Sequence, residues 1–149
     1  MSDFETRLNS IDWAQFETAY GAATRVPEFI RQLWAVDEKA VFQATHQLWC
    51  GLCHQHVFVS SAALPAFPFL LDALLCGSDA MKEEIMDIFL GFARCTSRSA
   101  EAEWERCLRL ELQENSHHFR VLTTHSNVEI ADFASWTLEE LRLKQPHSS

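Results

Sequence analysis

Glycine and proline are scarce in this chain, with four of each among 149 residues. A β-sandwich or β-barrel needs many tight turns and normally uses more of both residue types. Their scarcity therefore argues against an all-β fold. Leu, Ala, Glu, Gln and Arg are frequent instead, and all five favour helices. The composition predicts an all-α fold, and a length of 149 residues that are 48% hydrophobic suits one domain with a full core.

Basic residues are also few. The 12 Lys and Arg are scattered among 21 Asp and Glu, and the formal net charge is −9. A nucleic-acid-binding protein needs clustered cations to displace the counterions of the phosphates, so we expect no nucleic-acid ligand. An acidic protein attracts a basic partner at long range. The charge therefore favours another protein, with a basic surface, as the partner.

Long apolar runs are missing, because no stretch approaches the roughly 18 residues of a membrane-spanning helix. The first residues, MSDFETRLNSIDW, have neither the basic region nor the apolar region of a secretion signal. The five cysteines cannot all pair, which fits free thiols in a reducing compartment. We expect a cytoplasmic protein with no membrane partner.

A helical repeat runs through the first two thirds of the chain. VPEFIRQL (26–33) aligns with FPFLLDAL (67–74), with Pro27 on Pro68. The longer runs that follow, VFQATHQLWCGL (41–52) and MKEEIMDIFLGF (81–92), place Trp49 on Phe89 and Gly51 on Gly91. A helix–turn–helix unit of about 40 residues is typical of HEAT and armadillo repeats. The matched aromatic residues are predicted to be buried.

The repeat predicts the organisation of the whole chain. Each proline is expected in the first turn of the shorter, first helix of its pair. Backbone N–H groups in a first turn have no acceptor within the helix, so proline is tolerated there. A third copy consists of a helical stretch at 100–122 and a helix at 124–144, which Ser126 or Asn127 can cap. The prediction is a short right-handed α-solenoid of about three helix pairs with an N-terminal capping helix: helix 11–21, repeats 25–53, 64–95 and 99–144, and a tail at 145–149.

The stretch IDWAQFETAYGAATRVPEFIRQL, followed by LW, HQ and AALPAFPFLLDALL, resembles a family of small bacterial HEAT-repeat proteins. The resemblance covers roughly residues 11 to 95. His56 stands where the family more often has glycine, and Cys53 stands where an aromatic residue is common. The resemblance implies a non-enzymatic binding scaffold. It also implies a candidate immunity protein that neutralises a toxin, and it brings no catalytic residues with it.

The segment CGLCH (50–54) has the spacing of a c-type haem attachment site, and His56 would add a fourth ligand for zinc. A helix that ends here carries Cys50, Cys53 and His54 on neighbouring positions, but structural zinc usually takes a second ligand pair, and Cys95 and Cys107 stand alone. We therefore expect packing cysteines and no cofactor.

Catalytic patterns are weak in this sequence. Cys50 with His54, or Cys107, could form a thiol nucleophile, but the strained turn and partner acid of known nucleophile sites are absent. The prediction is that the chain is not an enzyme, and an enzyme or metal protein that uses Cys50, Cys53, His54 and His56 is the distant alternative.

The second helices of the repeats are expected to form an acidic concave surface that binds the partner. Helical-wheel positions opposite the buried stripe supply Gln43, His46, Gln47, Glu83, Asp87, Glu129, Asp132 and Trp136. The loop after the first of these helices adds His54, Gln55 and His56, and either the loop or the helix face could be the binding edge. Glu83 and Glu84 are expected on a solvated face. A general scaffold or regulatory subunit remains the alternative to a toxin inhibitor.

Overall fold

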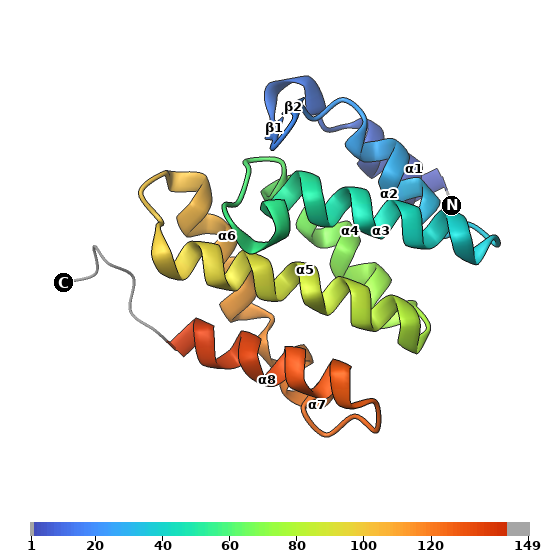
Figure 1. Ribbon diagram of the computed structural model, residues 1–149. Coiled ribbons are helices and arrows are strands. Elements are labelled where there is room, and N and C mark those ends of the chain that lie inside the picture. Colours follow the sequence, from blue (N-terminus) through green and yellow to red (C-terminus); the bar gives the residue numbers. More distant parts are fainter. Residues whose placement is uncertain (1, 143–149) are drawn as a thin grey trace.

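The computed structural model describes residues 2–142 and is built almost entirely from helices, which confirms the all-α class (Figure 1). Positions 143–149, with the end of the last expected helix and the tail, lie outside the described residues. The described part contains eight α-helices, two short 3-10 turns and one two-stranded hairpin. The helices are α1 (Ser2–Asn9), α2 (Val26–Gln32), α3 (Glu38–Cys53), α4 (Ala63–Cys76), α5 (Asp79–Arg98), α6 (Glu103–Glu114), α7 (Ser116–Leu122) and α8 (Val128–Arg142).

The first helix pair forms where the repeat predicts it. Pro27 lies in the first turn of α2. Backbone N–H groups there have no acceptor within the helix, so the N–H that proline lacks costs no hydrogen bond. Asp37 caps α3 by accepting a hydrogen bond from the Lys39 backbone N–H at 3.1 Å. Ala44 and Leu48 lie on the buried side of α3, as the apolar spacing indicates.

The second pair differs from the prediction at its first helix. α4 begins at Ala63, so Pro65 lies in its first turn and Pro68 lies inside the helix. The expectation that Pro68 starts the helix is therefore wrong. Its ring lies on the exposed side of α4, where it displaces no packed neighbour. Ser78 caps α5, since its hydroxyl accepts from the Met81 backbone N–H at 3.3 Å.

The prediction of a helix at 11–21 is also wrong. The region contains a 3-10 turn, η1 (Trp13–Gln15), and the hairpin strands β1 (Glu17–Thr18) and β2 (Gly21–Ala22), while the N-terminal helix is α1. The Trp13 indole donates to the Leu8 carbonyl at 3.1 Å, at the end of α1. The Thr18 hydroxyl donates to the Gly21 carbonyl, and Gly21 has a φ of 119°, which glycine adopts without strain. These contacts favour a turn over a continuous helix.

The third unit contains three helices rather than two. The stretch expected at 100–122 is broken at Asn115, whose side-chain amide donates to the Glu111 carbonyl at 2.8 Å. Asn127 caps α8, because its side-chain oxygen accepts from the backbone N–H groups of Glu129 and Ile130. The cap predicted at 126–127 is confirmed.

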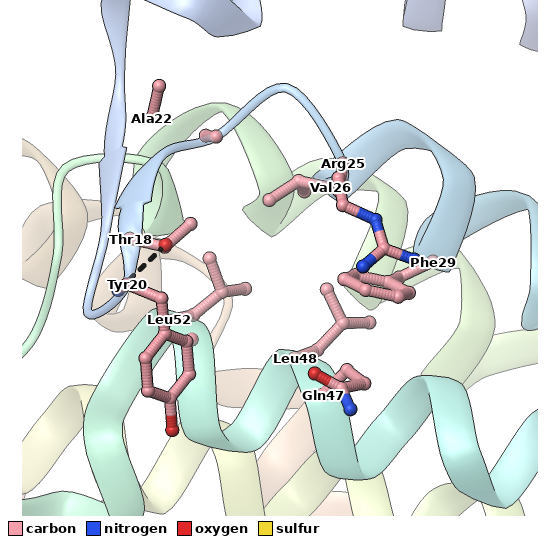
Figure 2. A pocket seen from close by; sticks show the side chains of 11 residues that line it. Thr18, Tyr20, Ala22, Arg25, Val26, Phe29, Gln47, Leu48 and Leu52 are labelled. Atoms are coloured by element: carbon pink, nitrogen blue, oxygen red, sulfur yellow. Dashed lines mark hydrogen bonds between the residues drawn. The ribbon is translucent and has the colours of Figure 1, made fainter.

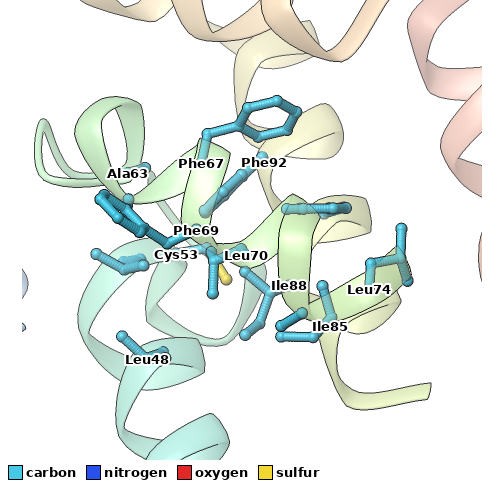
Figure 3. Close-up of a cluster of buried hydrophobic side chains, with 14 of the residues drawn as sticks. Leu48, Cys53, Ala63, Phe67, Phe69, Leu70, Leu74, Ile85, Ile88 and Phe92 are labelled. Carbon is cyan, nitrogen blue, oxygen red and sulfur yellow. The ribbon is translucent and has the colours of Figure 1, made fainter. Parts of the chain in front are cut away.

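The helices form two layers. α3, α5 and α8 lie side by side, and the first helices contact one another from α2 to α4 and from α4 to α6 (Figure 1). Between the layers, Phe67 of α4 and Phe92 of α5 lie in a cluster with Leu48 of α3 (Figure 3). The Phe89 ring has its centroid within 5.1–6.0 Å of those of Phe67, Phe92 and Phe119. α5 therefore lies at the centre of the packing.

One cation is buried at the end of this core. The Arg109 side chain of α6 is almost inaccessible, and its guanidinium donates to the Ala93 carbonyl, the Ser97 hydroxyl and the Glu140 carbonyl. Burial lowers the pKa of Arg109, and the charge of Glu140 acts in the opposite direction. Arg109 thus joins α5, α6 and α8.

None of the helices in residues 2–142 combines the length and the apolar character that crossing a bilayer requires.

Candidate partner-binding surface

Three of the predicted partner-binding residues lie on the outer surface of α3. Gln43, His46 and Gln47 are exposed, and the adjacent Phe42 is 38% exposed. These four residues line one shallow depression, together with Glu38 and Lys39. Gln47 also borders a second pocket of about 160 Å³, which Tyr20 of the hairpin lines at one side (Figure 2). The α3 surface therefore offers amides, an imidazole and a partly exposed ring.

The cysteines of CGLCH lie inside the protein. Cys53 is fully buried among Leu70 and Ile88, and its thiol donates to the Trp49 carbonyl at 3.3 Å (Figure 3). Burial raises the pKa of Cys53 far above its ordinary value of 9.0, so the thiol stays protonated. Cys50 is also buried. Within residues 2–142, His, Cys, Asp and Glu side chains form no group of three or more that could hold a metal ion.

The imidazole nearest to Cys50 is not the expected one. His46 Nε2 lies 3.6 Å from Cys50 Sγ, one helical turn earlier in α3, and His46 is exposed. His54 contacts Phe58 instead, with ring centroids 4.8 Å apart, and also Tyr20 at 6.2 Å. Cys50 and His54 are therefore not brought together as a thiol–base pair in the way the sequence suggested.

The loop after α3 contains a backbone feature that sequence reasoning missed. His54, Gln55 and His56 are three consecutive residues with positive φ, at 42°, 55° and 71°. Each non-glycine residue in this left-handed region costs about 1–2 kcal/mol relative to a right-handed turn. The three residues include no glycine that could have signalled a left-handed turn. Contacts to α5 must therefore stabilise the turn.

Those contacts centre on His56. Arg94 donates to His56 Nδ1 at 3.1 Å, which leaves Nε2 to carry the proton and to donate to Asp87 Oδ1 at 2.8 Å. Arg98 donates to the carbonyls of His56 and Val57. The His56 and Asp87 side chains are only 15% and 29% exposed. Both residues were predicted to contact a partner protein. In the structure their side chains form a hydrogen bond with each other.

Gly91 of α5 makes room for this turn. A Cβ at position 91 would lie 2.7 Å from the Cys53 thiol and 2.7 Å from His56 Cδ2. Gly51, which the repeat aligns with Gly91, has more space, since the nearest atom to a Cβ there is 3.6 Å away on Thr18. The two aligned glycines therefore have different structural roles.

The first half of α5 carries three carboxylates within two helical turns, Glu83, Glu84 and Asp87. Glu83 and Glu84 are half-buried rather than solvated, and the Thr45 hydroxyl of α3 donates to Glu84 Oε1 at 3.5 Å. Burial, followed by the charges of Asp87 and Glu83, raises the pKa of Glu84. Thr45 and His46 act in the opposite direction without reversing the shift. Glu84 is therefore a half-buried carboxylate with two like charges close to it.

The last part of the predicted surface lies on α8. Glu129, Asp132 and Trp136 are exposed, and the Trp136 ring contacts Phe133 edge-on at 6.0 Å. His125, just before α8, lies 3.2 Å from Asp79 at the start of α5. This contact holds the start of α8 close to the start of α5, and therefore close to the acidic half of α5.

A groove lies at the end of the molecule where the helix pairs turn. It has a volume of about 530 Å³ and lies between the α2–α3 turn and the α4–α5 turn. Val36, Val41, Phe42, Met81 and Glu84 contribute to its walls. It joins the exposed side of α3 to the acidic side of α5.

Comparison with known proteins gives no assignment: no family model, no curated protein and no solved structure matches this chain.

Proposed function

We propose that the chain is a non-enzymatic protein-binding module, built as a short right-handed α-solenoid, and that it binds its partner on the exposed surface of α3, α5 and α8. The adjacency of α3 to α5 and of α5 to α8, with the first helices in a second layer, supports the solenoid. A row of second helices is the usual binding surface of such repeats.

The observation that carries the proposal is the position of Glu84, which is half-buried on α5 next to Glu83 and about one helical turn before Asp87. Its pKa is raised because burial and two neighbouring carboxylates act on it together. A group from a basic partner would relieve this repulsion, and it would do so in a partly desolvated place where a charge pair is worth more than in open water. The net charge of −9 adds long-range attraction for such a partner.

The position of Cys50 supports a binding role over catalysis. Cys50 lies in the last turn of α3, where backbone N–H groups still bond within the helix. Thiol catalysis of acyl transfer needs free donors for the oxyanion, and a helix interior supplies none. The protonated state of Cys53 points the same way.

Photo-crosslinking tests the proposed surface. A benzophenone amino acid is placed at Gln43, Glu83 or Asp132, and in matched controls at Leu110 of α6 or Val121 of α7, which are 53% and 73% exposed. After irradiation in an extract of the native cells, the three surface positions should give an adduct with one common protein. Equal capture of that protein from both control positions would contradict the proposal.

The family resemblance extends the proposal to toxin neutralisation. In that case the crosslinked partner arrests growth when expressed alone, and co-expression of this chain restores growth. A partner without toxicity would assign the chain to the alternative class of scaffolds or regulatory subunits.

A further inference from the structure

The groove between the two helix-pair turns has an apolar wall that the fold itself does not explain. Val36 is fully exposed, and Trp34 two residues earlier is 46% exposed. Turns between helices are normally polar, because an exposed apolar side chain gains nothing from water. Here the turn LWAVDE ends α2 and presents Val36 beside Val41 and Phe42. These residues form one apolar side of the groove.

The opposite side of the groove belongs to the next helix pair. Met81, in the first turn of α5, supplies apolar surface there, and the small residues Gly77 and Ala80 also line the groove. The volume of about 530 Å³ falls within the range of roughly 300–1,000 Å³ that is usual for ligand-binding clefts. The groove is therefore large enough for a bulky side chain of another molecule.

The charges of the groove have one sign. Glu38, Asp79 and Glu84 line it, and none of its lining residues in the described part of the chain is Lys, Arg or His. The Asp79 carboxylate already has a partner outside the groove, because its Oδ1 lies 3.2 Å from His125 Nε2. Glu84 has a weaker contact, the 3.5 Å hydrogen bond from Thr45, and it is surrounded by Glu83, Asp87 and His46. Of these three carboxylates only Glu84 is half-buried, so it gains most from a new cation.

We propose that this groove binds a short basic amphipathic segment of the partner protein, with a large apolar side chain against Val36, Phe42 and Met81 and a Lys or Arg side chain on the Glu84 carboxylate. The inference rests on the proposed function, because it names the part of the partner that the α3 and α5 surface recognises. Apolar burial supplies attraction without direction, and the charge pair with Glu84 fixes the orientation of the segment.

A basic segment fits better than the other possible occupants. A purely apolar peptide would leave Glu84 desolvated and without a cation, which costs binding energy. An acidic segment would meet three carboxylates. A second copy of this chain would have to bring its own cations to the groove, and acidic residues outnumber basic ones by 21 to 12.

A designed peptide tests the inference without knowledge of the partner. The probe is a fluorescein-labelled amphipathic helical peptide of leucine and lysine. One control peptide has every lysine replaced by glutamate, and another has every leucine replaced by serine. Affinity is measured by fluorescence anisotropy, and the site is mapped by amide chemical shifts in the ¹⁵N-labelled full chain. The leucine–lysine peptide should bind and shift amides at 33–42 and 77–84, and both control peptides should bind at least about tenfold more weakly.

Matched variants locate the contacts. Glu84→Gln and Val36→Ser should each weaken peptide binding by about tenfold, whereas Glu114→Gln on α6 and Val121→Ser on α7 should leave it unchanged. Thermal melts confirm that all four variants are folded. Raising the salt concentration should reduce the effect of Glu84→Gln, because added ions screen the charge pair.

The remaining outcomes would overturn the inference. Binding that the groove variants do not change, shifts confined to α8, or no binding of the leucine–lysine peptide would show that the groove does not recognise a basic segment. Self-association that Val36→Ser abolishes would show that a second copy fills the groove. The crosslinking result at Gln43, Glu83 and Asp132 is independent of this peptide, so the proposed function stands or fails separately.

Discussion

His56 and Asp87 are joined by hydrogen bonds across 31 positions of the chain: the imidazole Nε2 lies 2.8 Å from both the Asp87 carboxylate and the Asp87 backbone carbonyl. The bond fixes the end of a left-handed turn on the middle of α5. The loop and the helix face, which the sequence offered as alternative binding edges, are therefore mechanically connected. A partner that moves Asp87 would also move the loop.

The left-handed turn predicts a stabilising substitution. Gln55 is exposed and has a φ of 55°, and its side chain makes one long contact, 3.9 Å from its amide nitrogen to Cys50 Sγ. Gln55→Gly removes a left-handed penalty of about 1–2 kcal/mol and adds about 0.5–1 kcal/mol of backbone entropy. Urea unfolding should show a net gain of about 0.5–1 kcal/mol.

The matched control for this change is Gln47→Gly, an exposed glutamine inside α3. It should lose about 1 kcal/mol, because glycine is a poor helix former. Equal losses at both positions would show that residue 55 is not left-handed in solution.

The two glycines that the repeat aligns should respond in opposite ways to alanine. Gly91→Ala places a methyl group 2.7 Å from both Cys53 and His56, so α3 and the turn must move, at a cost of about 1–3 kcal/mol. Gly51→Ala meets its nearest atom at 3.6 Å and should be neutral or stabilising by up to about 1 kcal/mol. Thermal and urea melts of both variants measure the difference. A stable Gly91→Ala protein would contradict the close packing of His56.

The aligned aromatic residues should also differ, contrary to the equal burial that the repeat predicts. Phe89 is inaccessible and contacts three other phenylalanines, so Phe89→Ala should cost about 3–5 kcal/mol. Trp49 is only half-buried, and its indole N–H has no hydrogen-bond partner among the described residues. Trp49→Ala should therefore cost clearly less than Phe89→Ala in the same urea titration.

Glu84 predicts a specific dependence of stability on pH. Burial first, and then the charges of Asp87 and Glu83, raise its pKa in the folded state above the ordinary value of 4.5. A group with a raised folded pKa contributes stability that is fully present below its unfolded pKa and is lost as the pH rises through its folded pKa. The free energy of unfolding of the wild type, relative to Glu84→Gln, should therefore fall as the pH rises above about 4.5.

Urea titrations of both proteins between about pH 4 and pH 7 measure this difference. Glu114→Gln, at an exposed position of α6, is the control and should follow the wild-type curve. Parallel curves for the wild type and Glu84→Gln would show that Glu84 is not in the acidic environment described above.

The sequence could predict the helix pairs because local signals and long-range packing agree there. Pro27, Asp37 and the apolar spacing of α3 all indicate the same boundaries. At the N-terminus they disagree. α1 carries apolar side chains mainly at Phe4 and Leu8, which is too little for a periodic signal, and residues 11–21 look helical until Trp13 bonds back to Leu8.

The site was harder to predict because its properties depend on distant neighbours. Glu84 accepts a hydrogen bond from Thr45, 39 positions away, and His56 pairs with Asp87 and Arg94. A helical wheel places a residue on a face, but it does not show which side chains from other helices reach that face. The exposed positions Gln43, His46 and Gln47 were predictable for the same reason, because no other element covers them.

The buried guanidinium of Arg109 bears on how the cell would dispose of a damaged copy of this protein. Its bond to the Glu140 carbonyl holds the end of α8 against the end of α5. A protease that removed the last turn of α8 would take away that acceptor and leave a buried cation with fewer hydrogen bonds, which strongly destabilises a core. The clipped chain would therefore unfold α6 and the end of α5 as well, and chaperones and proteases would clear it as an unfolded protein rather than retain it as a shortened one.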